Sequence, residues 1–330
     1  MLLRPSALVV LLLALASLGS ARTVGDELAD LIRRARGAPS PPERIEALEA
    51  IAGLTGGDDR PKRAQALASA LDDESTDVRV RGIQLLVDAG EHDIAIVALV
   101  KATKAVSREK EAQRKALDKY GRRRPPAFDP NTTHEKRMRD LEALRAWSAE
   151  GLKITERLAA LQSVSSALAS AFVALPDDRG VGALGDLLAD APAGADADAL
   201  VEALLGLGTG DALRQVAAYF PRVEKARGEV EGRVKKARRA KPGRKPKGRA
   251  KDEWEASEKQ RLAKAVARHE EGLAALDAWS ATLAERLAAF ATEHGLAPPP
   301  EAALPARPWR DWSTKQALLL PARVAAADGR

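Results

Sequence analysis

The chain has 330 residues, of which 45% are hydrophobic, 3% are aromatic and 30% are charged, with a formal net charge of +6. This composition, rich in Ala and Leu, favours long amphipathic helices over β-sheets, which are enriched in β-branched and aromatic residues. The chain contains no cysteine, which excludes disulfides, thiolate metal ligands and a cysteine nucleophile.

The N-terminal segment, from Met1 to Ala21, matches a secretory signal peptide. Arg4 supplies a positive charge, residues 7–18 are apolar, and Gly19-Ser20-Ala21 offers small residues for cleavage after Ala21. An uncleaved membrane anchor is the less favoured alternative, because the apolar run is shorter than the roughly 20 residues of a spanning helix. We expect no later segment to span a membrane. The mature protein is therefore expected to be exported, to the periplasm or the extracellular space.

Short amphipathic helices separated by turns are predicted from residue 22 to about residue 90. The apolar stripe of residues 28–35 ends near Gly37, and Ser40-Pro41-Pro42-Glu43 matches a capping box with proline in the first turn of the next helix. That helix is expected to stop at Gly56-Gly57. Further helices are expected near residues 61–71 and 77–89.

The last two of these helices resemble a HEAT repeat. The likeness rests on Leu71-Asp72-Asp73, on Asp77-Val78-Arg79 and on Leu85-Leu86 before Gly90. It implies an α-solenoid in which the Val-Arg pair opens the second helix of a repeat and aspartate–arginine pairs brace neighbouring repeats. The likeness covers residues 60–100 and, more weakly and without the Val-Arg pair, residues 180–220.

A longer pattern occurs twice in the chain. Residues 141–149 return at 273–281 with Trp147 matched by Trp279, and Glu-Arg-Leu-Ala-Ala at 156–160 returns at 285–289. Two matched tryptophans are not expected by chance in a chain that has five. The pattern predicts one helical unit used twice. We expect the two tryptophans to be equivalent buried packing residues rather than a ligand site.

Each copy is predicted to belong to a long antiparallel coiled-coil hairpin. The first hairpin leaves the body near Asp93, turns at a tip of about residues 121–133 and returns as far as Pro176. The second leaves near Asp211, with a kink expected at Pro221. It turns at a tip of about residues 240–251 and returns to a cap at Gly295.

The expected fold is all-α, with HEAT-like helical repeats and these two hairpins. A first helical unit is predicted over residues 22–176 and a second over residues 177–297. Residues 298–330 are predicted to form a Pro-rich linker and a capping helix near Thr314 to Ala327, with Trp309 and Trp312 closing the end of the stack.

Positive charge concentrates on the predicted arms and tips. Residues 101–124 contain ten Lys or Arg and three acidic residues, and residues 222–251 contain fourteen and three. One interpretation is the solubility of exposed segments, and the other is contact with a polyanion. The candidate polyanion contacts are the basic residues near the two tips, namely Arg122, Arg123, Arg124, Arg238, Arg239, Lys241, Arg244, Lys245, Lys247 and Arg249.

No catalytic, cofactor or metal site is predicted from the sequence. The four histidines are scattered and lack the spacing of metal ligands. Residues 206–211 are rich in glycine but miss the G-x-G-x-x-G spacing and follow no predicted strand. They are expected to form an interhelical turn like that of residues 87–93.

The sequence therefore predicts an exported, non-catalytic helical scaffold that binds an unknown protein partner. The alternative is a polyanion- or envelope-binding module whose basic tips contact an anionic glycan, a wall polymer or lipid headgroups. Nucleic acid is disfavoured, because the chain is expected to be exported and the second basic tip lacks aromatic residues for base stacking. An enzyme has no supporting group of residues.

Overall fold

The computed structural model describes residues 24–55, 59–128, 132–191, 195–241, 251–301 and 304–320. In these residues all regular secondary structure is helical, which confirms the predicted all-α class. The predicted signal peptide lies outside the described residues, as do the stop expected at Gly56-Gly57 and residues 321–330.

Four short helices form the N-terminal end of the molecule. They are α2 (Val24–Gly37), α3 (Pro41–Gly53), α4 (Arg60–Ser69), which the 3-10 turn η1 (Ala70–Asp72) extends, and α5 (Thr76–Asp88). The predicted N-cap of α3 is present. The backbone N–H of Glu43 donates to Ser40 Oγ at 3.4 Å, and proline occupies the first turn.

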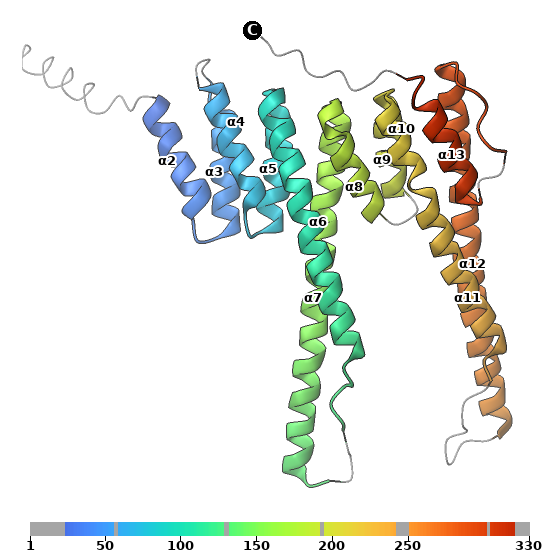
Figure 1. Ribbon diagram of the computed structural model, residues 1–330. Helices are drawn as coiled ribbons and strands as arrows, with labels where there is room; N and C mark the ends of the chain where they lie inside the picture. Colours follow the sequence, from blue (N-terminus) through green and yellow to red (C-terminus); the bar gives the residue numbers. More distant parts are fainter. Residues whose placement is uncertain are drawn as a thin grey trace, which may run out of the picture.

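The short helices lie side by side in a row, and two longer helix pairs extend beyond that row as arms (Figure 1). The first arm consists of α6 (His92–Arg122) and α7 (His134–Ala174), and the second of α11 (Phe220–Arg239) and α12 (Lys251–Glu293). The chain between the arms forms the turn η2 (Asp178–Gly180), α8 (Val181–Asp190), α9 (Ala195–Gly206) and α10 (Gly210–Ala217). The helix α13 (Ala306–Gln316) follows the second arm and packs against α10 and α11.

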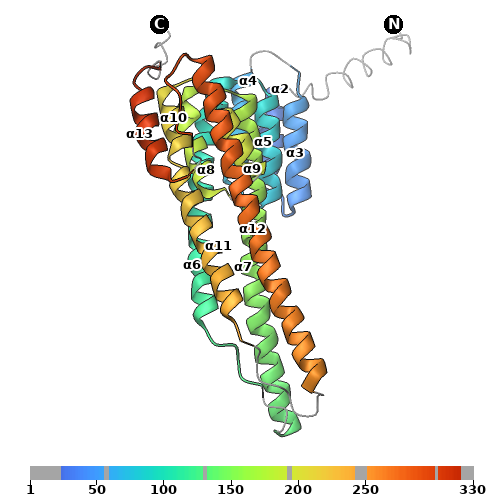
Figure 2. The ribbon, with the colours of Figure 1, turned by 90° about the vertical axis from the view of Figure 1, so that its right-hand side faces the viewer.

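The helices form two layers, which Figure 2 shows edge-on. One layer contains α4, α6, α8, α10 with α11, and α13, and the other contains α3, α5, α7, α9 and α12. Apart from α10 and α11, which share a layer, consecutive helices from α3 onward run antiparallel and alternate between the layers. We call the first the outgoing layer, because its arm helices run away from the body, and the second the returning layer.

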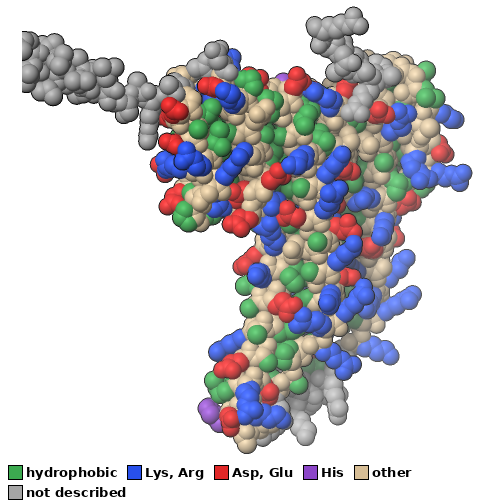
Figure 3. All heavy atoms as spheres, turned by 60° about the vertical axis from the view of Figure 1, so that its left-hand side comes forward, with side chains coloured by type: hydrophobic (Ala, Val, Ile, Leu, Met, Phe, Trp, Pro, Cys, Tyr) green, Lys and Arg blue, Asp and Glu red, His purple; other side chains and the backbone are tan. Residues whose placement is uncertain are grey.

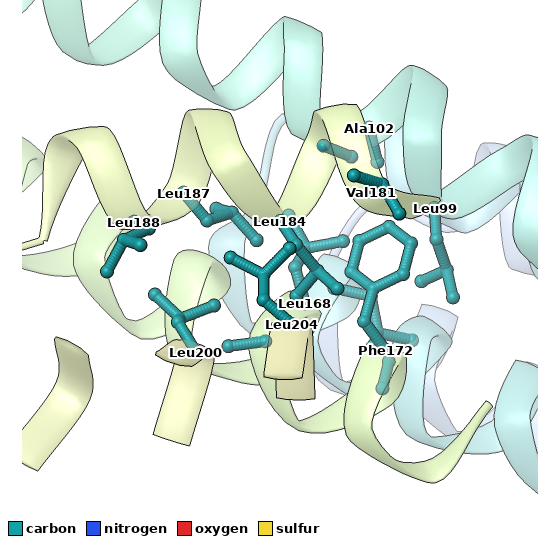
Figure 4. Close-up of a cluster of buried hydrophobic side chains, with 14 of the residues drawn as sticks. Leu99, Ala102, Leu168, Phe172, Val181, Leu184, Leu187, Leu188, Leu200 and Leu204 are labelled. Carbon is teal, nitrogen blue, oxygen red and sulfur yellow. The ribbon is translucent and has the colours of Figure 1, made fainter. Parts of the chain in front are cut away.

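The hydrophobic core lies between the two layers. In Figure 4, Phe172 and Leu168 of α7 point toward Leu184 of α8, Leu99 of α6 and Leu204 of α9, and all five are buried. Burial of each such side chain contributes about 1.5–3 kcal/mol. Helices that are far apart in the sequence therefore share one apolar cluster in the middle of the stack.

Charged side chains connect the first three helix pairs, which are α2 with α3, α4 with α5 and α6 with α7. Arg44 of α3 is 5% exposed and donates to Asp73 at 3.0 Å. Arg79 of α5 is 6% exposed, donates to the backbone carbonyl of Asp73 and pairs with Glu109 of α6 at 2.8 Å. Arg157 of α7 also pairs with Glu109, at 2.8 Å. Removal of one partner would leave a buried charge uncompensated, so these contacts fix how the pairs stack.

Glycines in the left-handed region end three helices. Gly90 and Gly208 have φ values of 73° and 65° and occupy corresponding turns before α6 and α10, which agrees with the predicted interhelical turns. Gly295 has a φ of 63°, and the N–H of Leu296 donates to the carbonyl of Ala291 at 2.8 Å. This bond belongs to a Schellman motif, so the predicted cap of the second returning helix is present.

Two helix boundaries differ from the sequence predictions. The chain does not kink at Pro221. It breaks after Ala217 and restarts as α11, with Pro221 in the first turn, where the missing N–H needs no partner. The capping helix is α13, which starts at Ala306 and ends at Gln316, so it overlaps only the start of the helix expected near Thr314 to Ala327; residues 317–320 are not helical, and the rest of that range lies outside the described residues. It starts earlier because Trp309 is fully buried and stacks on Phe220, with 4.6 Å between ring centroids.

The two repeated tryptophans are not equivalent. Trp279 is 8% exposed and contacts Tyr219 edge-on at the root of the second arm. Trp147 is only half-buried and stacks on Tyr120, near the end of α6, at 4.6 Å. Trp279 lies about four turns before the end of α12, whereas Trp147 lies about seven turns before the end of α7. The expectation of equivalent buried positions is therefore wrong.

By length and composition, α7 is also apolar enough to cross a membrane. This differs from the expectation that no segment after the signal peptide would be. The core helix of a helical stack meets the same criterion, and α7 packs against α5, α6, α8 and α9. Its apolar content is thus accounted for by the core, where Leu161, Val164 and Phe172 are buried.

Candidate interaction surface

The basic residues predicted at the first tip lie well back from the end of the arm. The connection between Arg122 and His134 has the predicted bounds. However, Arg123 donates two hydrogen bonds to the Glu150 carboxylate, at 2.6 and 2.8 Å. Glu150 follows the first residue of α7 by more than four turns, so Arg123 and its neighbour Arg124 lie about 24 Å short of the distal end.

The second arm has the same arrangement. The helix α11 ends at Arg239 and α12 begins at Lys251, which agrees with the predicted connection. Arg238 pairs with Glu270 at 2.5 Å, and Glu270 lies about 28 Å along α12 from its first residue. Figure 2 shows that both returning helices continue past the outgoing ones. Four candidates, Arg244, Lys245, Lys247 and Arg249, lie outside the described residues.

The described candidates lie at the predicted connections but back from the distal ends of the arms, and the reason is helix length. Each returning helix is longer than its outgoing partner, so the basic ends of α6 and α11 lie along the sides of the arms. The first turns of α7 form the distal end of the first arm. The structure does not bring the two sets of arginines together, because they belong to different arms.

Ion pairs neutralise half of the described candidates. Arg122 pairs with Asp118 at 2.8 Å, and Arg123 and Arg238 pair with carboxylates of the returning helices. The hydrogen bonds from Arg123 lower the pKa of Glu150. Arg124, Arg239 and Lys241 are exposed and form no ion pair with the described part of the chain. Exposed ion pairs contribute little to stability, so a partner could replace the carboxylates that Arg122, Arg123 and Arg238 contact.

Charge separates between the outgoing and returning arm helices. There are eight Lys or Arg against four acidic residues in α6, and eight against three in α11. The counts are six against five in α7 and six against nine in α12. The outgoing side of both arms is thus basic, and the returning side is neutral to acidic. Figure 3 shows Lys and Arg along one edge of the arms.

A groove of about 990 Å³ lies where the two arms leave the body. Arg114 of α6 pairs with Asp190 at 2.9 Å, while Arg222 and Tyr219 donate to backbone carbonyls at the end of α8. Donors from both arms therefore cap α8, whose C-terminus attracts cations. Burial raises the pKa of Tyr219 to about 12, so its hydroxyl stays neutral and donates. These contacts fix the roots of the arms relative to each other.

A smaller cavity of about 150 Å³ lies between α6, α7, α8 and α9. Lys110 is 4% exposed and donates to Gln162 Oε1 at 2.8 Å and Ser165 Oγ at 3.0 Å. Sequence reasoning missed this residue, because it counted Lys110 among the charges of the arm. The sequence did contain a signal for its burial: Lys110 follows the apolar residue Val106 by one helical turn, and this spacing places both on the inner side of α6. These bonds tie α6 to α7.

An ion cluster joins the start of α6 to η2. Arg179 donates to Asp177 and to Asp93, both at 2.7 Å, and His92 Nε2 lies 2.9 Å from Asp177. Hydrogen bonds from Arg179 hold the pKa of Asp177 well below its usual range, although partial burial opposes this shift. The cluster fixes the turn between the first arm and α8.

No group of three or more His, Asp or Glu side chains in the described ranges could hold a metal ion. His92, His134, His269 and His294 lie on separate helices or helix ends. No protein-family model, curated protein or solved structure matches the chain.

Proposed function

We propose that the chain is an exported scaffold of HEAT-like repeats that presents two coiled-coil arms to a protein partner and performs no catalytic step. The observation that carries this proposal is the row of stacked helix pairs from which two arms extend (Figure 1). Stacked pairs offer extended surfaces that suit protein binding.

Particular contacts support the HEAT-like interpretation. Val78 is fully buried in the first turn of α5, and the next residue, Arg79, bonds to Asp73 within its own pair and to Glu109 of the following pair. The resemblance implies such bracing between neighbouring repeats.

The spacing of apolar residues in the second arm supports the coiled-coil interpretation. Val223 and Val234 of α11 are buried, Val230 is half-buried, and α11 packs along α12. The intervals between these three valines, seven and then four positions, match a heptad seam.

Site-specific photo-crosslinking in the native host tests the scaffold proposal. A photoreactive residue would replace exposed Ala149 or Ala267 on the arms, with exposed Ala52 of α3 and Gln84 of α5 as matched body positions. We expect one adduct of defined mass at the arm positions. Adducts only at the body positions, or none at either arm, would overturn the role of the arms.

Export is tested separately, by N-terminal sequencing of the mature protein. We expect the mature chain to begin near Arg22, because the small residues before it suit signal peptidase. A mature pool that retains Met1 would contradict export.

The second candidate function is binding to an anionic envelope component, which the charge separation between arm helices favours. The sequence alone places this contact at the basic tips. That version is tested by replacing residues 240–250 with a short Gly/Ser turn and neutralising Arg238 and Arg239. If the tips bind, heparin retention should fall and its salt dependence should flatten. Unchanged retention with unchanged helicity would exclude the tips as the contact.

A further inference from the structure

Six basic side chains form one line along the outward side of α6. Their spacings of three, four and seven positions place them on the same side of the helix, and all six are exposed. The line extends for about 32 Å, from the body into the first arm. Its members, which we call the α6 line, are Lys101, Lys104, Arg108, Lys115, Lys119 and Arg122.

Most of the charge of the α6 line is available to a partner. Lys115 and Arg122 pair only with carboxylates one turn earlier in the same helix, and both of these pairs are exposed. Lys101 forms an exposed pair with Asp72 at 2.5 Å. The other three members form no ion pair within the described residues. Members separated by one turn lie within the Debye length of about 8 Å at physiological salt, so they act together.

A shorter line runs along the outward side of α11. Lys225, Lys236 and Arg239 lie on one side of this helix, with Gly228 and Gly232 between them, and all five residues are exposed. A Cβ added at Gly228 or Gly232 would meet no atom within 4 Å other than the neighbouring residues and the backbone of the helix itself. This side of α11 is therefore open. Because α6 and α11 belong to the same layer (Figure 2), lines on the outward sides of these two helices face the same side of the molecule.

We propose that this outgoing face docks on the anionic phospholipid headgroups of a membrane surface. A linear polymer would need one line of cations, whereas two lines on one face match a flat anionic surface. Val97 is 63% exposed one turn before Lys101 and supplies an apolar contact at the body end. Basic residues near an anionic leaflet bind it electrostatically. This inference rests on the envelope-binding candidate and moves the contact from the tips to the sides of the arms.

Vesicle co-sedimentation of the full mature chain tests the proposal. The vesicles would be pure phosphatidylcholine, or phosphatidylcholine mixed with the anionic lipid phosphatidylglycerol in a molar ratio of about two to one. The test variant reverses the three unpaired charges of the α6 line, Lys104→Glu, Arg108→Glu and Lys119→Glu. The matched control, Arg145→Glu, Lys153→Glu and Lys264→Glu, makes the same change in net charge at exposed positions of the returning layer.

We expect binding to the anionic vesicles alone, with a steep loss as salt rises. Each basic residue near an anionic leaflet changes partitioning about five-fold, so the loss of three should weaken binding at least about 100-fold, and repulsion from the three added glutamates should weaken it further. The control should stay within a few-fold of wild type. A test variant that binds like wild type, or an equal loss in both variants, would overturn the docking face. If the reversed variant loses helicity, the Gln variants at the same three positions replace it.

Comparison with heparin separates the remaining outcomes. Wild-type binding to heparin but not to anionic vesicles would show a linear polyanion as the ligand and reject the membrane. If the variant with residues 240–250 replaced and Arg238 and Arg239 neutralised lost vesicle binding, and the α6 variant did not, the contact would lie at the tips and the docking face would be rejected. Binding to neither ligand would reject the envelope-binding candidate itself. The scaffold proposal would not be affected by that result, because the photo-crosslinking experiment tests it separately.

Discussion

Gly210 shows how one residue joins two distant parts of the chain. It is the first residue of α10, and the backbone of Ala317, just after α13, passes directly over it. A Cβ atom at this position would overlap the carbonyl oxygen of Ala317. Backbone cannot move aside as a flexible side chain can, so the absence of a side chain here allows the capping helix to close the stack.

We therefore expect Gly210→Ala to destabilise the fold by about 1–3 kcal/mol, the usual cost of overpacking. Urea unfolding followed by circular dichroism measures this cost. Gly228→Ala is the control. Nothing approaches its Cβ position, and alanine should stabilise the middle of α11 by about 0.5–1 kcal/mol. A stable Gly210→Ala variant would show that α13 does not pack against the start of α10.

Asp177 provides a test by pH. Its pKa is held low by hydrogen bonds from Arg179, with His92 also in contact and Asp93 sharing the arginine. A carboxyl with a depressed folded-state pKa stabilises the fold above its unfolded pKa of about 3.9, and this contribution is lost as pH falls through the folded value. Asp177→Asn should thus cost about 1–2 kcal/mol at pH 7. The difference from wild type should shrink below about pH 4. Urea midpoints between pH 7 and pH 3 would show it, and a difference that is constant with pH would contradict it.

At the scale of helices, the two tryptophans of the repeated block differ in their surroundings. Trp279 is buried at the root of the second arm against Tyr219, whereas Trp147 is half-buried on the first arm against Tyr120. Trp279→Ala should cost about 3–5 kcal/mol, the range for large core aromatics. Trp147→Ala should cost about 1–2 kcal/mol, because less apolar area is lost. Guanidinium unfolding of both variants measures the difference. Equal costs would restore the equivalence that the sequence repeat predicted.

Local signals in the sequence predicted local structure well. The cap at Ser40, the turns at Gly90 and Gly208 and the motif at Gly295 all depend on a few neighbouring residues, and the structure contains each of them. Turn chemistry of this kind acts within one or two turns of helix. The all-α class was predictable from composition, because helix propensity is a property of the single residue and does not depend on distant contacts.

Features that depend on register between helices were not predictable in the same way. Stripes of Ala and Leu match one another in several alignments, so the repeat around Trp147 and Trp279 did not reveal how far each block lies from the body. The lengths of α7 and α12 relative to their partners also decide where the basic residues lie. Sequence counts found the charge, but only the packed helices show that it lies along the sides of the arms.

At the scale of the whole molecule, the described helices form a line in which each pair contacts mainly its neighbours. The N-terminal helix α2 packs chiefly on α3, and α13 packs on α10 and α11 at the other end. In such a stack, stability approximates a sum of terms from single pairs and their interfaces. Damage at one end should therefore open that end before the other.

Trp309→Ala tests this linear behaviour. Trp309 is fully buried and stacks on Phe220, so its loss should cost about 3–5 kcal/mol and leave a cavity between α13 and α11. Hydrogen exchange followed by mass spectrometry should show faster exchange in α10, α11 and α13, and unchanged exchange in α2 to α5. Leu48→Ala in α3 is the mirror control, because Leu48 is 1% exposed at the opposite end. It should speed exchange in α2 to α5 alone. Faster exchange at both ends in either variant would mean that the described chain opens as one cooperative unit, with the two arms coupled through the body between them.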